Sequence, residues 1–490
     1  MNQEKVKKRD LLSILAVALV AFAGILSETS MNVTFPHLSQ VFGLSLGVLQ
    51  WITTGYLLAA AITITLGATL SHNWTERRIL FTSLSIFTLG NLLSMIAPDF
   101  TFLMLGRILQ GGATGIAIPL MFNLIVERVP RQKIGFYMGL SGLVISIAPA
   151  IGPTYGGFMI GSFDWHMIYS FIMPVPILSF LLAYVNLENS AGKSKRPFDV
   201  LGFLSLATAL SFSLMTISSL EGGDSVNWLY LVIFLLSFAV FIWRSLTVQH
   251  PFLDIRILKE PTIFFGILPF LIFQFSNLSS NFLIPNFLVL VKNVSTAQAG
   301  FSLLPGTMIG AFMSPFLGKL YDSKGPKLSL LGGNSLVFLV MIVFSFFTSW
   351  LNLPLILGFY ILFTLGRNMA FNNTMALSAS QVSRDKTADV TALFQLAQTF
   401  AGALGTAIAA VLLNQAPNTT SGVHNVFSLL LLLAIGNFIF YYSCFEQFIR
   451  RKKPNFLSRL PLGIFSLVKS RFFKYNFSEN CDKIETITFR

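Results

Sequence analysis

The sequence predicts an all-α membrane protein that crosses the bilayer many times. Of its 490 residues, 54% are hydrophobic and only 11% are charged, whereas about a quarter of the residues in a soluble domain carry charge. Apolar runs of about 20 residues, long enough to span the hydrocarbon core as helices, recur along the chain. Lys and Arg gather between these runs. The net charge of +13 is therefore attributed to membrane orientation and not to nucleic-acid binding.

Fourteen apolar segments are candidate transmembrane helices. We expect them near residues 11–35, 47–70, 78–97, 101–126, 134–160, 166–187, 200–220, 228–248, 262–291, 298–321, 328–349, 353–378, 391–414 and 424–447. Cations precede the first segment and follow every second one, while the other connections, Lys292 apart, are nearly free of them. Because basic loops stay in the cytoplasm, an even number of helices with both termini cytoplasmic is predicted.

Two long polar interruptions, at residues 186–199 and 249–261, divide the chain. We expect a cytoplasmic N-terminus at 1–10, six-helix bundles at 11–187 and 262–447, and two extra helices in a linking region at 188–261. The tail, 448–490, is expected to be basic and amphipathic against the inner leaflet, or disordered near its end. The tripeptide Leu-Gly-Arg occurs in the fourth helix of each bundle, which indicates internal repeats typical of secondary transporters.

Small residues and prolines mark the fifth segment. Because residues four apart share a helix face, they form two adjacent stripes: Ala148, Gly152 and Gly156, and Pro149, Pro153 and Gly157. Small residues let another helix approach closely, and the prolines bend the segment. Taken alone, the segment is most simply a kinked packing helix.

Two charged residues within the spans are candidates for proton coupling. Glu28 is the one carboxylate predicted away from the ends of a span. A charged acid in hydrocarbon costs about 2.5–3.5 kcal/mol, so this side chain must be protonated, paired or in contact with a wet cavity. A solvated position near the outer interface is the alternative. Arg107 could hold Glu28 or favour its deprotonation, or it could be a structural tie between helices.

Other polar and aromatic side chains within the spans are candidates for a substrate cavity, because unpaired polar groups are costly in lipid. They are Trp51, Tyr56, Gln110, Asn277, Asn281, Arg367, Asn368 and Asn372. The sequence contains no phosphate-binding Gly-rich motif, no cluster of metal ligands and no Gly-x-Ser-x-Gly motif. We therefore expect neither ATP hydrolysis nor a metal or cofactor, and no enzyme activity.

Several motifs resemble the major facilitator superfamily, specifically its fourteen-helix drug:proton antiporters. Residues 148–157 are similar to the antiporter motif of helix 5, and residues 105–112 resemble the helix 4 motif with its membrane-embedded arginine. Residues 318–327 resemble the family's gating loop, Gly-x-Leu-x-Asp-x-x-Gly-x-Lys, with matches at Gly318, Asp322, Gly325 and Lys327. The corresponding loop of the first bundle, 67–78, lacks the family's Asp. The position of Glu28 resembles a subgroup near the lincomycin-resistance transporters.

This resemblance implies the major facilitator fold and a proton-coupled exporter of lipophilic drugs that works by alternating access. It further implies a bacterial plasma membrane, Glu28 and Arg107 as the coupling groups, and the fifth helix at the bundle interface. Expected partners are protons, membrane lipids and a small lipophilic substrate, cationic in many relatives, with no nucleic acid and a monomeric protein. An exporter of a lipid, siderophore or metabolite is the alternative, followed by a receptor or scaffold that transports nothing.

Overall fold

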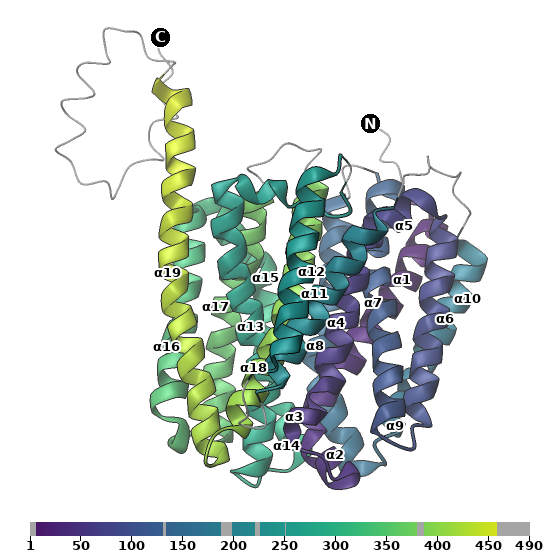
Figure 1. The fold of residues 1–490 in the computed structure, drawn as a ribbon, viewed down its shortest axis with the longest axis vertical. Coiled ribbons are helices and arrows are strands. Elements are labelled where there is room, and N and C mark those ends of the chain that lie inside the picture. The colour runs from purple at the N-terminus through teal and green to yellow at the C-terminus, as the bar shows by residue number, and fades with distance from the viewer. Residues whose placement is uncertain are drawn as a thin grey trace, which may run out of the picture.

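All regular structure in the described part of the chain is helical. A computed structural model describes residues 6–130, 134–187, 198–220, 226–249, 251–379 and 387–457. Figure 1 shows long helices standing side by side, with the start of α1 and the end of α19 at the same end of the bundle. The predicted all-α class is confirmed for these residues.

The helices drawn purple to blue form a first block on one side of the bundle (Figure 1). Ser45, Thr75 and Asp99 cap three of its helices, because their side-chain oxygens accept backbone N–H groups of the first turn. The block comprises α1 (Lys8–Ser30), η1 (Met31–Val33), α2 (Phe35–Phe42), α3 (Leu46–Leu49), α4 (Trp51–Ile64), α5 (Gly67–Asn73), α6 (Glu76–Met95), α7 (Phe100–Arg128), α8 (Ile134–Ser162), α9 (Met167–Ile172) and α10 (Pro174–Asn186).

The helices drawn green to yellow form a second block on the other side (Figure 1). Proline stands at the start of α13, α15 and α16, where its missing N–H costs no helical hydrogen bond. The block comprises α13 (Pro261–Leu290), α14 (Thr296–Phe301), α15 (Leu304–Lys324), α16 (Pro326–Phe346), η4 (Thr348–Trp350), α17 (Leu353–Ala379), α18 (Thr387–Asn414) and α19 (Thr419–Leu457).

Thirteen segments of the described residues are long and apolar enough to cross a membrane. Each overlaps one predicted span. The remaining predicted span, 134–160, coincides with α8, a helix of 29 residues with several side chains outside the described part. The prediction of many membrane-spanning helices is confirmed, while the count of fourteen stays a prediction. Of the predicted tail, α19 covers the part up to Leu457, and residues 458–490 lie outside the described residues.

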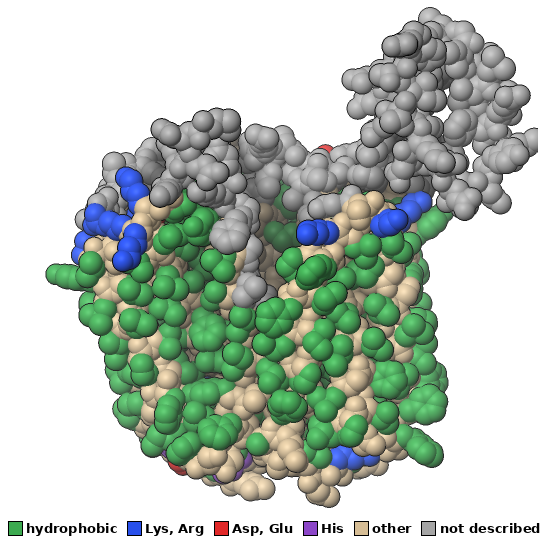
Figure 2. All heavy atoms as spheres, turned by 180° about the vertical axis from the view of Figure 1, so that it is seen from behind, with side chains coloured by type: hydrophobic (Ala, Val, Ile, Leu, Met, Phe, Trp, Pro, Cys, Tyr) green, Lys and Arg blue, Asp and Glu red, His purple; other side chains and the backbone are tan. Residues whose placement is uncertain are grey.

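The surface separates apolar walls from a basic rim. Figure 2 shows hydrophobic side chains over the sides of the bundle, with Lys and Arg gathered mainly at the end where α1 begins and α19 ends. It also shows a recess in the surface between two basic groups at this end. Apolar walls are expected where lipid surrounds the protein, and a basic rim is expected on the cytoplasmic side.

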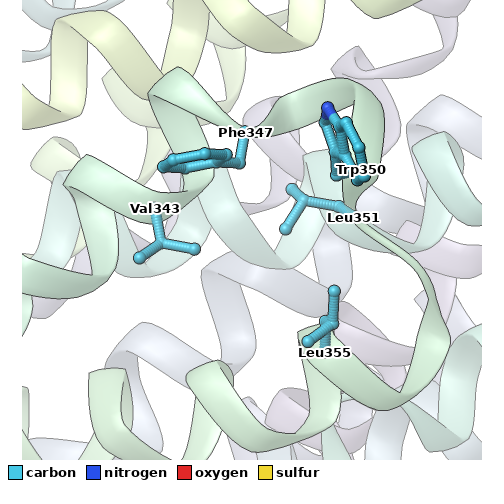
Figure 3. A pocket seen from close by; sticks show the side chains of 5 residues that line it. All are labelled: Val343, Phe347, Trp350, Leu351 and Leu355. Atoms are coloured by element: carbon cyan, nitrogen blue, oxygen red, sulfur yellow. The ribbon is translucent and has the colours of Figure 1, made fainter.

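Aromatic side chains form a shallow apolar pocket on the wall of the second block. It has a volume of about 250 Å³ and lies where α16, η4 and α17 meet (Figure 3). Trp350, which is 79% exposed, lines it together with Val343, Phe347, Leu351 and Leu355. Exposed aromatic residues of this kind are typical of the membrane–water interface. The pocket contains none of the predicted site residues, so we attribute it to lipid contact.

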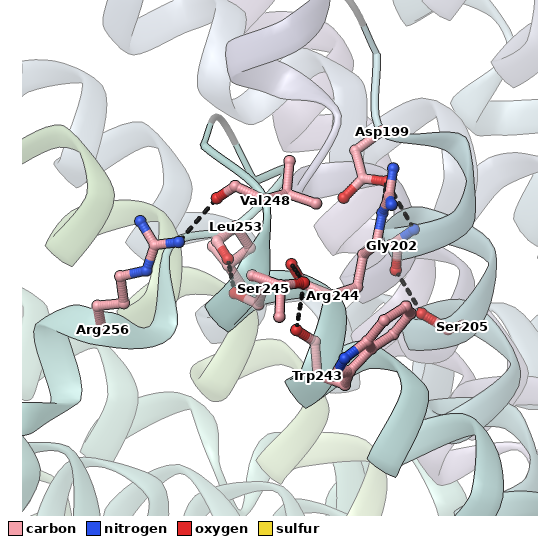
Figure 4. Close-up of polar contacts among 10 residues, drawn as sticks. Asp199, Gly202, Ser205, Trp243, Arg244, Ser245, Val248, Leu253 and Arg256 are labelled. Carbon is pink, nitrogen blue, oxygen red and sulfur yellow. Dashed lines mark hydrogen bonds and ion pairs between the residues drawn. The ribbon is translucent and has the colours of Figure 1, made fainter.

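Two further helices, α11 (Val200–Ser218) and α12 (Trp228–Thr247), stand between the blocks in sequence and lie in front of their seam (Figure 1). Asp199 caps α11 at the N–H of Gly202 (3.1 Å) and accepts a hydrogen bond from Arg244 Nε of α12 (2.9 Å). Arg256 of η3 (Ile255–Lys259) donates to two carbonyls at the end of α12, at 2.7 and 2.9 Å (Figure 4). These contacts join the pair to the start of the second block.

The pair differs in burial. Leu214 of α11 packs in one apolar cluster with Leu57 of α4 and Ala403 of α18, so α11 covers the seam between the blocks. By contrast, only 11% of the residues in the most apolar stretch of α12 are buried. A helix that is apolar and exposed on most of its circumference is one that faces lipid.

The two blocks repeat the same helix packing. Gly106 of α7 lies against Gly90 of α6, and a Cβ built on it would be 2.6 Å from the Gly90 carbonyl oxygen. The equivalent distance from Gly366 of α17 to the Gly333 carbonyl of α16 is 2.7 Å. Glycine is required at all four positions because the backbones approach this closely. The two Leu-Gly-Arg tripeptides therefore occupy equivalent places.

A buried asparagine repeats in the same way. Asn91 of α6 donates from Nδ2 to the Tyr169 carbonyl at 2.8 Å, which ties α6 to the last membrane segment of the first block. Asn334 of α16 donates to the Ala434 carbonyl of α19 at 3.0 Å, which ties α16 to the last segment of the second. Each asparagine directly follows the glycine of the close contact. The structure thus supports internal duplication.

Candidate transport site

Glu28 lies near the end of α1, among the helices of the first block. Its side chain is 5% exposed, and Oε1 is buried without a hydrogen-bond partner among the described residues. Arg107 and Tyr56 lie close enough to interact with it electrostatically. This burial does not fit the alternative of a solvated carboxylate at the interface. A carboxyl oxygen that lacks a donor can exchange a proton without breaking a hydrogen bond.

Arg107 is completely buried and joins three helices. Nε donates to the Ile52 carbonyl of α4 at 3.1 Å, and Nη1 donates to Ser27 Oγ of α1 and to Gln110 Oε1, both at 2.7 Å. The guanidinium lies 4.5 Å from the centre of the Tyr56 ring. These contacts support the structural interpretation of Arg107 beside its predicted role in coupling.

The hydrogen-bond network continues from Gln110 into α6. Nε2 of Gln110 lies 3.4 Å from Asn91 Oδ1 and 3.5 Å from Ser94 Oγ, while Tyr56 donates to Thr114 at 2.8 Å. The structure thus brings four predicted residues together and adds Ser27, Asn91, Ser94 and Thr114. Thr114 could have been predicted as a member of this network from the sequence, because it lies four residues after Gln110 and therefore shares its helix face.

Arg367 anchors a second polar cluster, between α17 and α13. Nη2 donates to Gln274 Oε1 at 2.8 Å, and Nη1 donates to Asn368 Oδ1 at 3.0 Å. Unlike Arg107, Arg367 is partly exposed. Gln274 was not predicted, although its spacing of three residues from Asn277 places the two amides on one face of α13.

The other predicted cavity residues take different places. Asn281 is 2% exposed and accepts a hydrogen bond from Tyr360 of α17 at 2.6 Å, so it ties two helices of one block. Asn277 is partly buried on the same face of α13, and Trp51 is partly buried at the start of α4. Asn372 is exposed, one turn along α17 from Asn368. Their contact with a substrate stays a prediction.

The two clusters have the same sequence offset from one contact between the blocks. The rings of Phe35 and Phe282 meet across the block interface, with centroids 5.8 Å apart. Ser27 precedes Phe35 by eight residues and Gln274 precedes Phe282 by eight, and each of them binds the arginine of its own block. On α13, which is one continuous helix, eight residues rise about 12 Å, whereas a 3-10 turn at Met31–Val33 separates Ser27 from Phe35.

The blocks meet around that contact, toward the end where α2, α3 and α14 lie (Figure 1). Asn286 of α13 donates to the Asn32 carbonyl at 3.3 Å, and the hydroxyls of Thr54 and Thr406 are 2.9 Å apart. Asn32 Nδ2 and Asn286 Oδ1 are nevertheless buried without partners among the described residues. Polar groups left unpaired when this end closes lower the cost of opening it to water.

The two stripes of α8 contact different blocks. A Cβ on Gly152 or Gly156 would collide with Thr29 Oγ1 or the Ser30 carbonyl of α1, so this stripe packs within the first block. A Cβ on Gly157 would lie 2.6 Å from the Thr296 carbonyl of α14. On the same stripe as Gly157, the Pro153 carbonyl would lie 2.1 Å from a Cβ built on Gly300 of α14. The described contacts thus place α8 against helices of both blocks, and its predicted role as an antiporter motif stays a prediction.

The predicted gating loop is helical for most of its length. Gly318 lies within α15, which continues to Lys324, and only Gly325 forms the turn into α16. Its φ of 81° lies in the region that glycine adopts without strain. Lys327 is exposed, and the side chain of Asp322 lies outside the described residues. The gating role stays a prediction.

Comparison with known sequences identifies the family. Residues 17–406 match the family described as Major Facilitator Superfamily. The chain belongs to the major facilitator superfamily. It is 32% identical to the lincomycin resistance protein LmrB of Bacillus subtilis over 402 residues, which are 81% of this chain and 84% of that protein. It is 24% identical to a multidrug resistance protein B homolog of Mycobacterium tuberculosis over 381 residues, 76% of this chain and 70% of that one.

Solved structures of other transporters share the fold. A bacterial homolog of the human lysosomal transporter Spinster, in an inward-facing and occupied conformation, superposes with a TM-score of 0.66 at 13% identity, covering 91% of this chain and 99% of that one. A POT family transporter in complex with 5-aminolevulinic acid gives 0.66 at 12% identity, with 88% and 96% covered. The protein is therefore a multi-pass membrane transporter of the major facilitator superfamily.

Proposed function

We propose that the protein is a proton-coupled secondary transporter that exports lipophilic drugs across the bacterial plasma membrane by alternating access. The buried carboxyl of Glu28 carries the proposal, because Oε1 has no hydrogen-bond donor among the described residues and the adjacent Ser27 accepts a hydrogen bond from Arg107 at 2.7 Å. A group so placed can accept a proton from one side and release it to the other. Two similar proteins are named a lincomycin resistance protein and a multidrug resistance protein B homolog, and these names support drugs as the transported substrates.

The proposed orientation has fourteen helices and both termini in the cytoplasm. The basic rim beside the start of α1 and the end of α19 supports it (Figure 2). The blocks contact each other toward the opposite, outer end, so this structure corresponds to the inward-facing state of the cycle. Protonation of Glu28 from outside and its deprotonation inside would then drive drug outward.

The test measures transport in inverted membrane vesicles under an imposed pH gradient. The substrates are lincomycin, ethidium and fluorescein, and the proteins are the wild type, Glu28→Gln and the control Asp164→Asn. Asp164 has a side chain that is 60% exposed and lies outside the predicted spans. We expect gradient-driven uptake by the wild type and the control and its loss in Glu28→Gln, with protein amounts equal on immunoblots.

Two results would contradict the proposal. Equal gradient-driven uptake by the wild type and Glu28→Gln would exclude Glu28 as the coupling group. No gradient-driven uptake of any of the three compounds by the wild type would contradict drug export, and would favour the alternative of a dedicated lipid, siderophore or metabolite exporter on the same fold.

A further inference from the structure

The arginines of the two Leu-Gly-Arg repeats occupy equivalent positions but differ in access. Arg107 is 0% exposed and donates to two other helices of its own block, at Ile52 and Ser27. Arg367 is partly exposed, and its hydrogen bonds go to side-chain amides of Gln274 and Asn368. The first arginine is enclosed in packing, whereas part of the second is exposed beside α13, the helix whose Phe282 contacts the first block. The duplication thus supplies one structural arginine and one accessible arginine.

The charge of Arg367 has no counter-ion among the described residues. Arg107 has Glu28 nearby, but the groups in contact with Arg367 are neutral amides and the ring of Phe371. A guanidinium has five N–H donors. Two of the donors of Arg367 are used, and Nε is buried with no partner among the described residues. Nη2 of Arg107 is unpaired in the same way, so the two arginines differ in the counter-ion and not in the number of spare donors. A partly exposed cation with spare donors and no counter-ion can bind an acceptor group that brings negative charge.

An aromatic stack stands behind the guanidinium. The Arg367 Cζ lies 4.6 Å from the centre of the Phe371 ring, and Phe371 stacks on Phe270 with centroids 4.0 Å apart at 11°. Phe394 meets Phe270 edge-on at 4.8 Å. Phe371 thus packs against the guanidinium, and the buried rings of Phe270 and Phe394 support Phe371. A carboxylate on a flat apolar body matches both features.

We propose that Arg367, with Gln274 and Asn368, forms a subsite that binds the carboxylate of an aromatic or other lipophilic substrate. The inference rests on the proposed function only in taking the space between the blocks as the transport path. It changes the charge expected of the cargo, because the second cluster contains no acid among its described residues. The first cluster contains an acid and an arginine, whereas the second contains the positive charge of Arg367 alone, so the second cluster favours an anionic ligand.

Binding to purified protein in nanodiscs at pH 7, without any gradient, tests the subsite. The probes share one ring system and differ in charge: 2-naphthoate, 2-naphthamide and 2-naphthylmethylammonium. We expect the wild type to bind naphthoate about tenfold or more tightly than the ammonium probe, and Arg367→Gln to lose about tenfold or more of its naphthoate affinity. Naphthamide, which is neutral, should change by less than about threefold.

Matched variants separate charge at the site from charge elsewhere. Lys292→Gln removes a cation from the connection between α13 and α14 and should leave naphthoate binding unchanged. Arg367→Lys keeps the charge but loses the planar fork, so it should bind naphthoate more weakly than the wild type and more tightly than Arg367→Gln. Equal naphthoate affinity of Arg367→Gln and the wild type would overturn the proposal, as would a wild type that prefers the ammonium probe or binds no naphthoate.

Chemical modification of the wild type gives a second measurement that needs no variant to fold. Phenylglyoxal reacts with accessible arginines, and mass spectrometry locates the product. We expect Arg367 to be modified, Arg107 to be spared, and saturating naphthoate to protect Arg367. An unreactive or unprotected Arg367 would reject the subsite. A protein that binds naphthoate through Arg367 but shows no gradient-driven transport would refute the proposed function and leave the subsite standing.

Discussion

Two adjacent glycines of α8 allow the outer closure to be tested apart from the fold. A Cβ at Gly156 would collide with the Ser30 carbonyl of α1 within the first block. A Cβ at Gly157 would lie 2.6 Å from the Thr296 carbonyl and 3.1 Å from Ala297 Cα, both in the second block. Gly156→Ala therefore strains contacts present in every state, whereas Gly157→Ala strains contacts that exist only while the outer end is closed.

The magnitudes follow from overpacking and helix propensity. Forcing one extra carbon into a filled contact costs about 1–3 kcal/mol, and Ala in place of Gly returns about 1 kcal/mol in a helix. Gly156→Ala should thus lower the free energy of unfolding by about 0–2 kcal/mol. For Gly157→Ala the relevant equilibrium is between the inward-facing and the outward-facing state. The gain in helix propensity is the same in both states, because α8 is helical in both, and it therefore does not shift this equilibrium. The full strain, about 1–3 kcal/mol, should shift the equilibrium toward outward-facing by about 5- to 150-fold.

Double electron–electron resonance measures the distance between two spin labels, and its distance distribution reports the populations of the inward-facing and outward-facing states. Labels at Gln40 of α2 and Gln298 of α14, both exposed and on different blocks, report the outer separation in a Cys444→Ala, Cys481→Ser background. We expect Gly157→Ala to populate a longer distance and Gly156→Ala to leave the distribution unchanged. If the two variants gave the same distribution and the same loss of thermal stability, the assignment of the two stripes to different blocks would be refuted.

Two further predictions concern buried polar ties, and both are checked by thermal unfolding of purified protein. Arg107→Gln should cost about 3–5 kcal/mol, because it removes three hydrogen bonds and leaves the Glu28 carboxyl without its cation; wild-type stability combined with lost transport would show instead that Arg107 is purely functional. Asn91→Ala and Asn334→Ala should each cost about 1–3 kcal/mol, because each removes a buried hydrogen bond that ties two helices of one block and leaves a gap where the amide packs. A loss confined to one of these variants would argue against equivalent packing in the two blocks.

Much of the architecture could be predicted because it depends on local composition. Hydropathy along the chain located each described membrane segment, since burying a helical backbone in lipid requires about 20 apolar residues wherever they occur. The spacing of Ala148, Gly152 and Gly156 indicated a close helix contact for the same reason, because helical periodicity places these residues on one face. The Leu-Gly-Arg tripeptides indicated the repeat, and the matching glycine contacts support it.

The partners of each side chain could not be predicted this way. Asn372 and its neighbour Asn373 are equally polar in the sequence, yet Asn372 is exposed while Asn373 is buried and donates to Ser329 at 2.7 Å. Ser27 and Gln274 gave little signal of their own, and they belong to the site because each receives a hydrogen bond from an arginine on another helix. Burial depends on which helices pack alongside, and periodicity within one helix does not specify them.

Hydropathy, charge and motif spacing were enough to predict an all-α chain of many membrane-crossing helices with repeated motifs, and to locate an acid and two arginines within its spans. The helix packing was needed to show that Arg107 is enclosed and Arg367 partly exposed, and that one stripe of α8 contacts its own block while the other contacts the second. Hydropathy and helix period act over a few turns of one segment, whereas access, pairing and closure depend on contacts between different helices, whose residues are about 50 to 140 positions apart in the sequence.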